Sequence, residues 1–210
     1  MHKDARLKAP VFEIGLKGYV YGAEAVRLAR EADRLSHQYG VTVIFDPQHV
    51  DIPAVARETQ HLLVFAQHMD PVKVGRGAGS VLPEAIKEAG AVGTMLNHSE
   101  RRMTLAEIYR AIKRADEVGL ATMVCADSPE EAAAIAQLGP NIVLAEPPEL
   151  KLVTQVGRAA SADATCFTQL PHQPPFEYPP NHLKSPQRQP CRCAYLTYGL
   201  WFSPPNLHNF

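Results

Sequence analysis

Short apolar runs that alternate with longer helical patterns constrain the fold of this chain more than any other feature of its sequence. Six of the runs are apolar at consecutive positions, which is typical of strands buried on both faces of a parallel sheet. The stretches between them repeat their apolar residues with helical spacing. The sequence therefore predicts a parallel α/β sheet covered by helices. The predicted strands are Val11–Leu16, Val41–Phe45, Leu62–Ala66, Ala91–Leu96, Ala121–Val124 and Ile142–Ala145, and the predicted helices are Ala23–Tyr39, Ile52–Gln60, Leu82–Ala89, Leu105–Val118 and Pro129–Leu138.

Local signals mark where several of these helices begin and end. Thr104 with Glu107, and Ser128 with Glu131, have the spacing of a capping box, in which two side chains satisfy the first free amides of a helix. Pro129 supports the second start, because proline suits the first helical position. Glycines able to adopt a left-handed conformation follow four of the helices. They are Gly40, Gly90, Gly119 and Gly139.

The spacing of the strands leaves two architectures open. Six strands end by residue 145, so each strand–helix unit takes about 24 residues, a compact value for parallel α/β units. Such units build either a doubly wound open sheet or a (β/α)₈ barrel that needs two further units. Periodicity alone does not separate these architectures, so the loops have to.

Composition and charge narrow the functional class. Lysine and arginine total 21 against 22 acidic residues, and this balance indicates neither a nucleic-acid nor a membrane partner. No run of about 18 apolar residues is present, as a membrane-spanning helix would need, and the polar start Met1–Asp4 does not resemble a secretory signal. Of the four cysteines only Cys125 lies in the patterned part, which argues against a disulfide framework. We therefore expect a cytoplasmic protein.

Three polar residues stand just past the ends of predicted strands. Lys17 follows the first strand, His98 the fourth and Glu146 the sixth. In barrels of parallel strands, functional residues gather where the carboxyl ends of the strands meet. Moving a proton next to a carbonyl group needs a carboxylate base, a neutral donor facing the oxygen and a cation that holds the enediolate charge. A glutamate, a histidine and a lysine supply these three roles, although polar residues also occupy loop ends without any chemical role.

Four segments resemble triosephosphate isomerase of the compact archaeal type. The resemblance covers about residues 9–150 and is strongest over the third to fifth predicted strands. Its most specific part is Asn97–Glu100, because this block joins a strand end to a particular helix start. It implies a (β/α)₈ barrel that is incomplete here, since six strands are recognisable and strands 7 and 8 are not evident. The four segments are Ala66–Pro71, Leu82–Thr94 with Asn97–Glu100, Glu117–Cys125 and Glu146–Leu150.

The resemblance implies a role for each matching residue. Glu146 matches the catalytic base that moves a proton between two carbons of a triose phosphate. His98 matches the electrophile, and this enzyme is a known example of a neutral imidazole near a helix N-terminus. Lys17 matches the lysine that binds the substrate and offsets its charge, and Glu100 matches a supporting carboxylate behind it. A phosphorylated triose is the implied partner, with no cofactor and no metal. The family forms homo-oligomers, and the oligomeric state of this chain stays open.

Two positions depart from the pattern of the family. Gly15 stands two residues before the lysine, where the family usually has asparagine, so the site loses a side-chain amide. The glycine-rich stretch 75–79 falls where the family has a loop that helps subunits to pair, and its amino-acid sequence differs from that of the family. It also lacks the spacing of a phosphate-binding loop, so we interpret it as a flexible connection.

The chain divides into a partial barrel over residues 1–150 and a proline-rich tail over residues 151–210. Residues 161–210 hold 9 of the 18 prolines, and no strand followed by a capped helix is recognisable there. Three explanations of the tail stay open: a shifted reading frame, an appended segment that is disordered or binds a partner, and a metal site on Cys191 and Cys193.

Two functional interpretations follow from these observations. The first is an isomerase that interconverts dihydroxyacetone phosphate and glyceraldehyde 3-phosphate, or that acts on another short ketose phosphate. We expect its turnover to be impaired, because the two units that would hold the phosphate are not evident. The second interpretation is a barrel remnant without catalytic activity.

Overall fold

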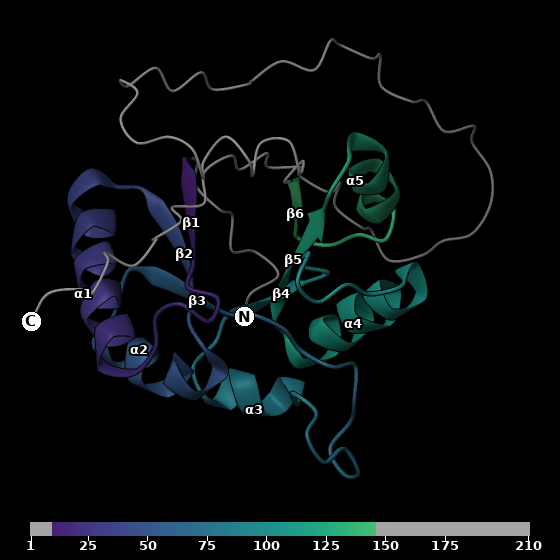
Figure 1. The fold of residues 1–210 in the computed structure, drawn as a ribbon, viewed down its shortest axis with the longest axis horizontal. Coiled ribbons are helices and arrows are strands. Elements are labelled where there is room, and N and C mark those ends of the chain that lie inside the picture. Colours follow the sequence, from purple (N-terminus) through teal and green to yellow (C-terminus); the bar gives the residue numbers. More distant parts are fainter. Residues whose placement is uncertain (1–9, 146–210) are drawn as a thin grey trace, which may run out of the picture.

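The computed structural model describes residues 10–145, which form six β-strands in alternation with helices (Figure 1). Glu146 and the tail over residues 151–210 lie outside the described residues. Helices and strands occur where the sequence predicts them, and their ends differ by only a few residues; β4, for example, begins at Gly93. In chain order the elements are β1 (Val11–Gly15), α1 (Gly22–Tyr39), β2 (Thr42–Asp46), the 3₁₀ turn η1 (His49–Asp51), α2 (Ile52–Glu58), β3 (Leu62–Ala66), α3 (Pro83–Glu88), β4 (Gly93–Leu96), α4 (Leu105–Val118), β5 (Ala121–Ala126), α5 (Pro129–Ala136) and β6 (Ile142–Ala145).

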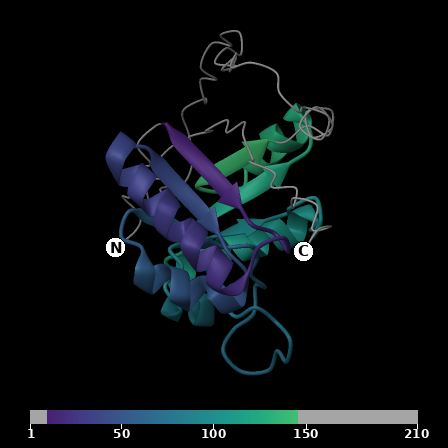
Figure 2. The same cartoon turned by 60° about the vertical axis from the view of Figure 1, so that its left-hand side comes forward.

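All neighbouring strands are parallel, and their order in the sheet is β1-β2-β3-β4-β5-β6. A doubly wound sheet reverses its strand order at a switch point, and no such reversal occurs within residues 10–145. Two views show the sheet curving around, with the helices on its outer, convex side (Figures 1 and 2). The described part of the chain is therefore an open segment of a (β/α)₈ barrel, with β1 and β6 at its two edges.

Side chains from the strands fill two separate layers, because successive residues of a strand point to opposite faces of the sheet. The outer layer lies between the sheet and the helices. The inner layer fills the concave side, and it includes the buried Cys125. Gly93 leaves room there for the Phe65 ring, since a Cβ at Gly93 would lie 2.4 Å from a ring atom. The inner cluster consists of Ile44, Phe65, Met95, Met123, Cys125, Ile142 and Leu144.

One of the two predicted capping boxes is confirmed, and the other is wrong. Thr104 and Glu107 cap α4 reciprocally, each side chain accepting from the backbone amide of the other. At α5 the Ser128 hydroxyl accepts from the Glu131 amide at 3.1 Å, but the Glu131 carboxylate does not return to Ser128. It accepts instead from the amide of Asp127 at 2.7 Å. The carboxylate is drawn away because other groups near the site bind it, as described below.

The predicted helix ends and the glycine-rich loop behave differently. Positive φ angles at Gly40, Gly90, Gly119 and Gly139 confirm that these residues close helices in a left-handed conformation. The loop between β3 and α3 projects beyond the helices (Figure 1) and is exposed over residues 73–79. Its start is tied to α4, since Arg114 donates to the carbonyl of Val72 at 2.9 Å.

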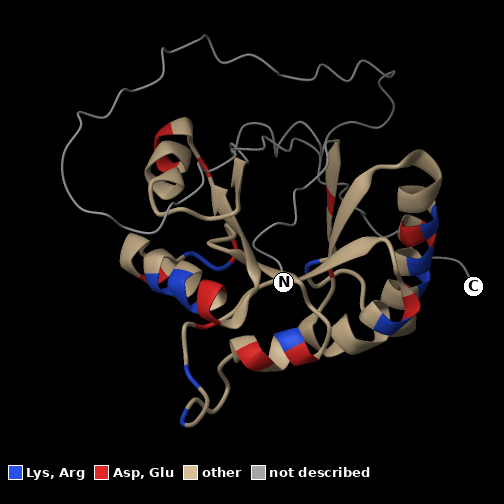
Figure 3. Ribbon diagram, turned by 180° about the vertical axis from the view of Figure 1, so that it is seen from behind, with Lys and Arg blue, Asp and Glu red and all other residues tan. Residues whose placement is uncertain are grey.

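Charged side chains lie mainly on the outer helices, and the strands are mostly uncharged (Figure 3). On α1, for example, arginine and glutamate side chains form ion pairs on the exposed surface. Among the helices of residues 10–145, none is long and apolar enough to span a membrane. The few charged residues on the strands therefore stand out, and two of them lie at the site described next.

Candidate active site

A cavity of about 320 Å³ opens at the carboxyl ends of the first four strands. This volume is at the lower end of the range for small-molecule sites. Three of the four predicted site residues, Lys17, His98 and Glu100, line it together. The fourth, Glu146, directly follows Ala145 at the end of β6 and lies outside the described residues.

Lys17 adopts a strained backbone conformation at the end of β1. Its φ angle is 50°, in the left-handed region that non-glycine residues seldom adopt. The turn is held because the Lys17 carbonyl accepts hydrogen bonds from the side-chain amides of Gln48 and Gln67. The lysine side chain is 17% exposed, and its Nζ lies 3.6 Å from Oε1 of Glu100. The loop thus fixes an ammonium group at the cavity and ties it to the end of β4.

Gln67 joins the ends of three strands, although no role was predicted for it from its sequence position. Its amide donates to the carbonyl of Lys17 after β1 and to the carbonyl of Asp46 in β2, at 3.0 Å in each case. It follows β3 itself. Gln67 belongs to the segment Ala66–Pro71 that carries the family resemblance, and this was the available signal.

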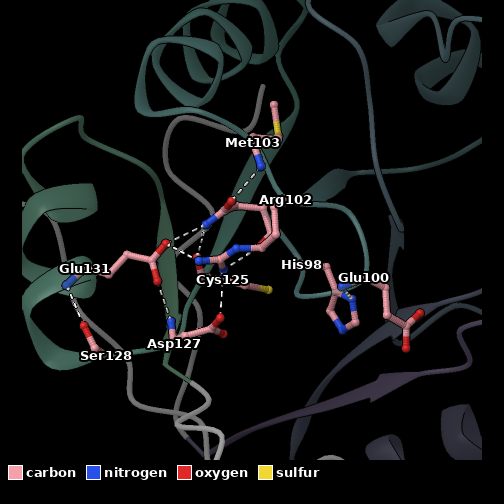
Figure 4. Close-up of polar contacts among 9 residues, drawn as sticks. His98, Glu100, Arg102, Met103, Cys125, Asp127, Ser128 and Glu131 are labelled. Atoms are coloured by element: carbon pink, nitrogen blue, oxygen red, sulfur yellow. Dashed lines mark hydrogen bonds and ion pairs between the residues drawn. The ribbon is translucent and has the colours of Figure 1, made fainter.

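The imidazole of His98 accepts a hydrogen bond from the backbone. The amide of Glu100 donates to His98 Nδ1 at 3.2 Å (Figure 4). Since Nδ1 accepts, the neutral ring carries its proton on Nε2 and can donate from that atom. A turn follows His98, closed from the Arg101 amide to the His98 carbonyl at 2.8 Å, and α4 begins at Leu105 as predicted.

Asn97 anchors the backbone that carries His98. It has a φ angle of 57°, and its side chain is buried. The amide Nδ2 donates to the carbonyl of Cys125 at 2.9 Å and to Oε1 of Glu131 at 3.1 Å. Its Oδ1 accepts from the amide of Met103 at 2.9 Å. The side chain therefore ties both ends of the loop to β5 and α5.

The carboxylate of Glu131 accepts hydrogen bonds from three groups of this network. Burial alone would raise the pKa of Glu131, but hydrogen bonds from the amide of Asp127 and the side chains of Arg102 and Asn97 outweigh it, so the pKa is lowered. The guanidinium of Arg102 forms two ion pairs: its Nη2 lies 2.8 Å from Oε1 of Glu131, and its Nη1 lies 3.2 Å from Oδ2 of Asp127. These contacts occupy the carboxylate that the sequence assigned to a capping box.

A second group of contacts holds the rim formed by the loop after β3. His68 is buried, and its Nε2 lies 3.2 Å from Oδ1 of Asp70. Burial lowers the pKa of His68, against the opposing effect of Asp70, so the ring stays neutral near neutral pH. Asp70 also accepts from the amide of Val81 at 2.7 Å and lies 3.5 Å from Arg101. These contacts indicate a structural role for His68 at the rim of the cavity.

Two buried acids on the floor of the cavity were not predicted. Asp46 ends β2 and is completely buried, and neither of its carboxylate oxygens has a hydrogen-bond donor within residues 10–145. Burial raises the pKa of Asp46 well above its usual range, and the neighbouring Glu13 carboxyl adds to the rise. Glu13 lies in β1 and is 6% exposed. Both acids occur within apolar runs, where sequence patterns indicate burial and not chemistry.

The residues of the cavity do not form a metal site. Within residues 10–145, no group of three or more histidine, cysteine, aspartate or glutamate side chains is arranged to hold an ion. The alternative metal site on Cys191 and Cys193 lies outside the described residues.

Comparisons with known proteins agree with this geometry. The family model of triosephosphate isomerase matches residues 11–145. The chain is 44% identical to triosephosphate isomerase of Methanobacterium bryantii over 68% of its own length and 64% of that relative. It is 43% identical to the enzyme of Methanothermus fervidus, over 67% of its own length and 64% of that relative. The chain thus spans somewhat less than two thirds of the length of these curated relatives.

A solved structure supports the fold independently. The structure of triosephosphate isomerase from Bartonella henselae superimposes with a TM-score of 0.57 over 70% of this chain and 72% of that one. At 18% identity the likeness shows the barrel fold alone. Because the family model covers all six described strands and the archaeal relatives share the same region, the chain belongs to the triosephosphate isomerase family.

Proposed function

We propose that this protein is an aldose–ketose isomerase that interconverts dihydroxyacetone phosphate and glyceraldehyde 3-phosphate. One observation supports the proposal most: Lys17 and His98, from different strand ends, line one cavity, and the backbone fixes the imidazole with its proton on Nε2. An ammonium and a neutral imidazole donor are two of the three groups that enediolate chemistry requires.

Each residue has a distinct role in the proposed reaction. A base removes a proton from the carbon next to the carbonyl, and the same proton or its solvent replacement returns to the former carbonyl carbon. His98 donates its Nε2 proton to the carbonyl oxygen as negative charge develops there, and it regains a proton from the neighbouring hydroxyl, which becomes the new carbonyl. Lys17 stabilises the enediolate and the phosphorylated substrate by its charge. Glu146, which follows β6 in the sequence, is proposed as the base.

The relation between Glu100 and His98 supports a neutral imidazole. The Glu100 amide donates its proton to Nδ1. A proton bound to Nδ1 would make the ring positively charged and would repel the amide proton, so this contact favours the neutral ring. The imidazole can therefore act as a donor and return to its neutral state without a change in its contacts. The Glu100 side chain reaches the other way, to Lys17, so one residue relates the positions of both reactive groups.

The proposal is tested with the full chain by following the conversion of glyceraldehyde 3-phosphate in ²H₂O. We expect dihydroxyacetone phosphate to form with deuterium at carbon 1, because the abstracted proton exchanges with solvent. His98→Gln and Glu146→Gln should each reduce turnover by about 10²- to 10⁴-fold, the usual contribution of a positioned acid or base.

Matched substitutions separate a chemical role from a general effect of mutation. His61→Gln changes an exposed histidine that stacks on His37, and Glu149→Gln changes a glutamate three residues after Glu146. Both variants should turn over like the parent. No conversion above the buffer rate would instead favour the barrel remnant, and variants at His98 and Glu146 as active as the parent would remove these residues from the mechanism.

Four finer statements remain predictions. We propose that turnover is impaired relative to full-length relatives, since the chain spans less than two thirds of their length. The division into a barrel over residues 1–150 and a distinct tail over residues 151–210 belongs to the same proposal. Cytoplasmic location is predicted by composition and cysteine content, and self-association by the family resemblance.

A further inference from the structure

The side chain of Glu13 occupies space that another residue would ordinarily fill. A Cβ built at Gly15 would lie 2.7 Å from Oε1 of Glu13, closer than real atoms approach. Both residues line the cavity with Lys17 and His98. In this arrangement the carboxylate of Glu13 occupies the space that a side chain at residue 15 would fill at the cavity.

Asp46 holds Glu13 in place from the neighbouring strand. The parallel register sets Gly15 opposite Asp46 and Glu13 opposite Ile44. Glu13 and Asp46 therefore stand two residues apart along neighbouring strands, and their carboxyl groups interact. Two buried carboxylates at such close quarters cannot both ionise, and they share one proton. Asp46 is completely buried, and no N–H or O–H group among residues 10–145 donates to its oxygens. Its ionised form is therefore the less stable of the two, so Asp46 retains the proton and donates it toward Glu13. The pair then carries one negative charge on the side of Glu13.

An ionised carboxylate is a hydrogen-bond acceptor only. It would repel the enediolate, whose negative charge is spread over the oxygens of carbons 1 and 2, so it has to contact a hydroxyl outside the reacting pair. Dihydroxyacetone phosphate has no such hydroxyl: its one hydroxyl and its carbonyl oxygen both become part of the enediolate. A ketose phosphate with one more carbon does carry a free hydroxyl.

We propose that Glu13 is a specificity-determining residue of this cavity, whose carboxylate accepts a hydrogen bond from a substrate hydroxyl that takes no part in the reaction. The preferred substrate is then a four-carbon ketose phosphate, and Asp46 is the positioning residue that orients Glu13. The inference rests on the isomerase activity proposed above and specifies the substrate class of the same site.

The neighbouring charges are arranged to permit this contact. Lys17 and Arg101 supply positive charge around the cavity, and Glu100 is committed to Lys17 at 3.6 Å. His68 and Asp70 are engaged with each other at the rim. Among the acids that line the cavity in the described part of the chain, Glu13 is thus the one whose carboxylate lies against the missing side chain of residue 15.

The test compares two substrates and two unreactive ligands on the full chain. Steady-state kinetics gives kcat/KM for dihydroxyacetone phosphate and for erythrulose 4-phosphate. Calorimetric titration gives Kd for glycerol 3-phosphate and for erythritol 4-phosphate, which has one hydroxymethylene group more. We expect the parent protein to favour the four-carbon member of each pair by about tenfold or more, as for a hydrogen bond to a charged group.

Two substitutions vary the acceptor at nearly constant volume. Glu13→Met removes it and should abolish the four-carbon preference in both measurements. Glu13→Gln keeps a neutral acceptor oxygen and should retain part of the preference, which a merely structural role for Glu13 would not produce. Asp46→Asn supplies a permanent donor toward Glu13 and should keep the parent preference. Glu88→Met, at an exposed position on α3, is the matched control.

The outcomes separate this inference from the proposed activity. If neither ketose phosphate reacts, the proposed function fails, while the ratio of the two Kd values still tests Glu13. If Glu13→Met does not fold, the ratio for Glu13→Gln decides. A parent protein without four-carbon preference, or a preference that Glu13→Met and Glu13→Gln leave unchanged, overturns the inference.

Discussion

The end of β4 and the ends of β1 and β2 supply the same cavity but are built in opposite ways. After β4, the amide of Asn97 has three protein partners, and the carboxylate of Glu131 beside it meets an arginine and two N–H donors. At β1 and β2, two acids lie together, and the oxygens of Asp46 lack a donor within residues 10–145. The region after β4 satisfies the hydrogen bonds of its buried polar groups, and the region at β1 and β2 buries the Asp46 carboxyl group without a donor.

This difference separates support from recognition. A satisfied network contributes to stability and fixes the loop that carries His98, whereas a buried carboxyl group such as Asp46, whose oxygens lack a donor within residues 10–145, costs stability. The pKa values express the same contrast. Hydrogen bonds lower the pKa of Glu131 despite its burial, while burial raises the pKa of Asp46. The two regions should therefore respond to mutation and to pH with opposite sign.

Asn97→Ala should produce the largest effect. It removes the hydrogen bonds of Asn97 to the Cys125 carbonyl, the Glu131 carboxylate and the Met103 amide, and it places alanine at a φ of 57°. We expect a loss of about 3 kcal/mol in the free energy of unfolding, measured by urea denaturation. Asn97→Gly removes the same contacts but tolerates the left-handed backbone, so it should cost about 1 kcal/mol less. A loss below about 0.5 kcal/mol for Asn97→Ala would show that the network does not support the loop.

Asp46→Asn should act in the opposite direction. It removes a buried ionisable group and supplies an N–H donor to Glu13, so we expect a gain of about 1–2 kcal/mol at pH 8. The sign follows from linkage: the folded pKa is raised, so the folded chain keeps a proton that the unfolded chain releases as pH rises. The cost of Asp46 therefore grows above the ordinary carboxyl pKa, and the gain should shrink toward pH 4.

Glu131 provides the control for this pH dependence. Its folded pKa is lowered, so its contribution is present above the unfolded pKa and is lost as pH falls through the folded value. Glu131→Gln should thus destabilise the protein at pH 8 and approach the parent in acid. Urea denaturation of both variants at pH 4, 6 and 8 should give difference curves of opposite sign; curves of one sign would contradict the assigned environments.

These two regions also differ in how much of them could be predicted from the sequence. The positions of Lys17 and His98 follow from strand ends, because parallel strands bring their carboxyl ends to one edge. The sheet order follows from the family resemblance and not from periodicity, which is the same in an open α/β sheet. The Glu13–Asp46 pair could not be found, because pairing depends on strand register and an acid inside an apolar run carries no signal of its own.

The second capping box shows the same limit on a smaller scale. Ser128 and Glu131 have the correct spacing, and the first half of the motif forms. The second half of the motif does not form, because the Glu131 carboxylate binds Asn97 and Arg102, which follow β4 and are distant in sequence. Local patterns predict which groups can interact, and tertiary competition decides which of them do.

The two helix starts allow this competition to be measured. Thr104→Ala breaks a reciprocal box and should cost about 1 kcal/mol of stability. Ser128→Ala removes a single hydrogen bond and should cost less, about 0.5 kcal/mol, since Glu131 stays bound elsewhere. Thermal unfolding of the two variants gives the order directly. A larger effect at Ser128 than at Thr104 would mean that the α5 cap is coupled to the Asn97 network.

Glu100→Gln should have the smallest effect and bears most directly on how the site is organised. The side chain of Glu100 is 61% exposed, and its ion pair with Lys17 spans 3.6 Å, so we expect a loss below about 0.5 kcal/mol, which 0.5 M salt should remove. The backbone amide that contacts His98 remains in the variant, so kcat should stay within about twofold of the parent. If kcat instead falls tenfold, the carboxylate positions the ammonium of Lys17, and the supporting role implied by the family resemblance resides in the side chain and not in the backbone.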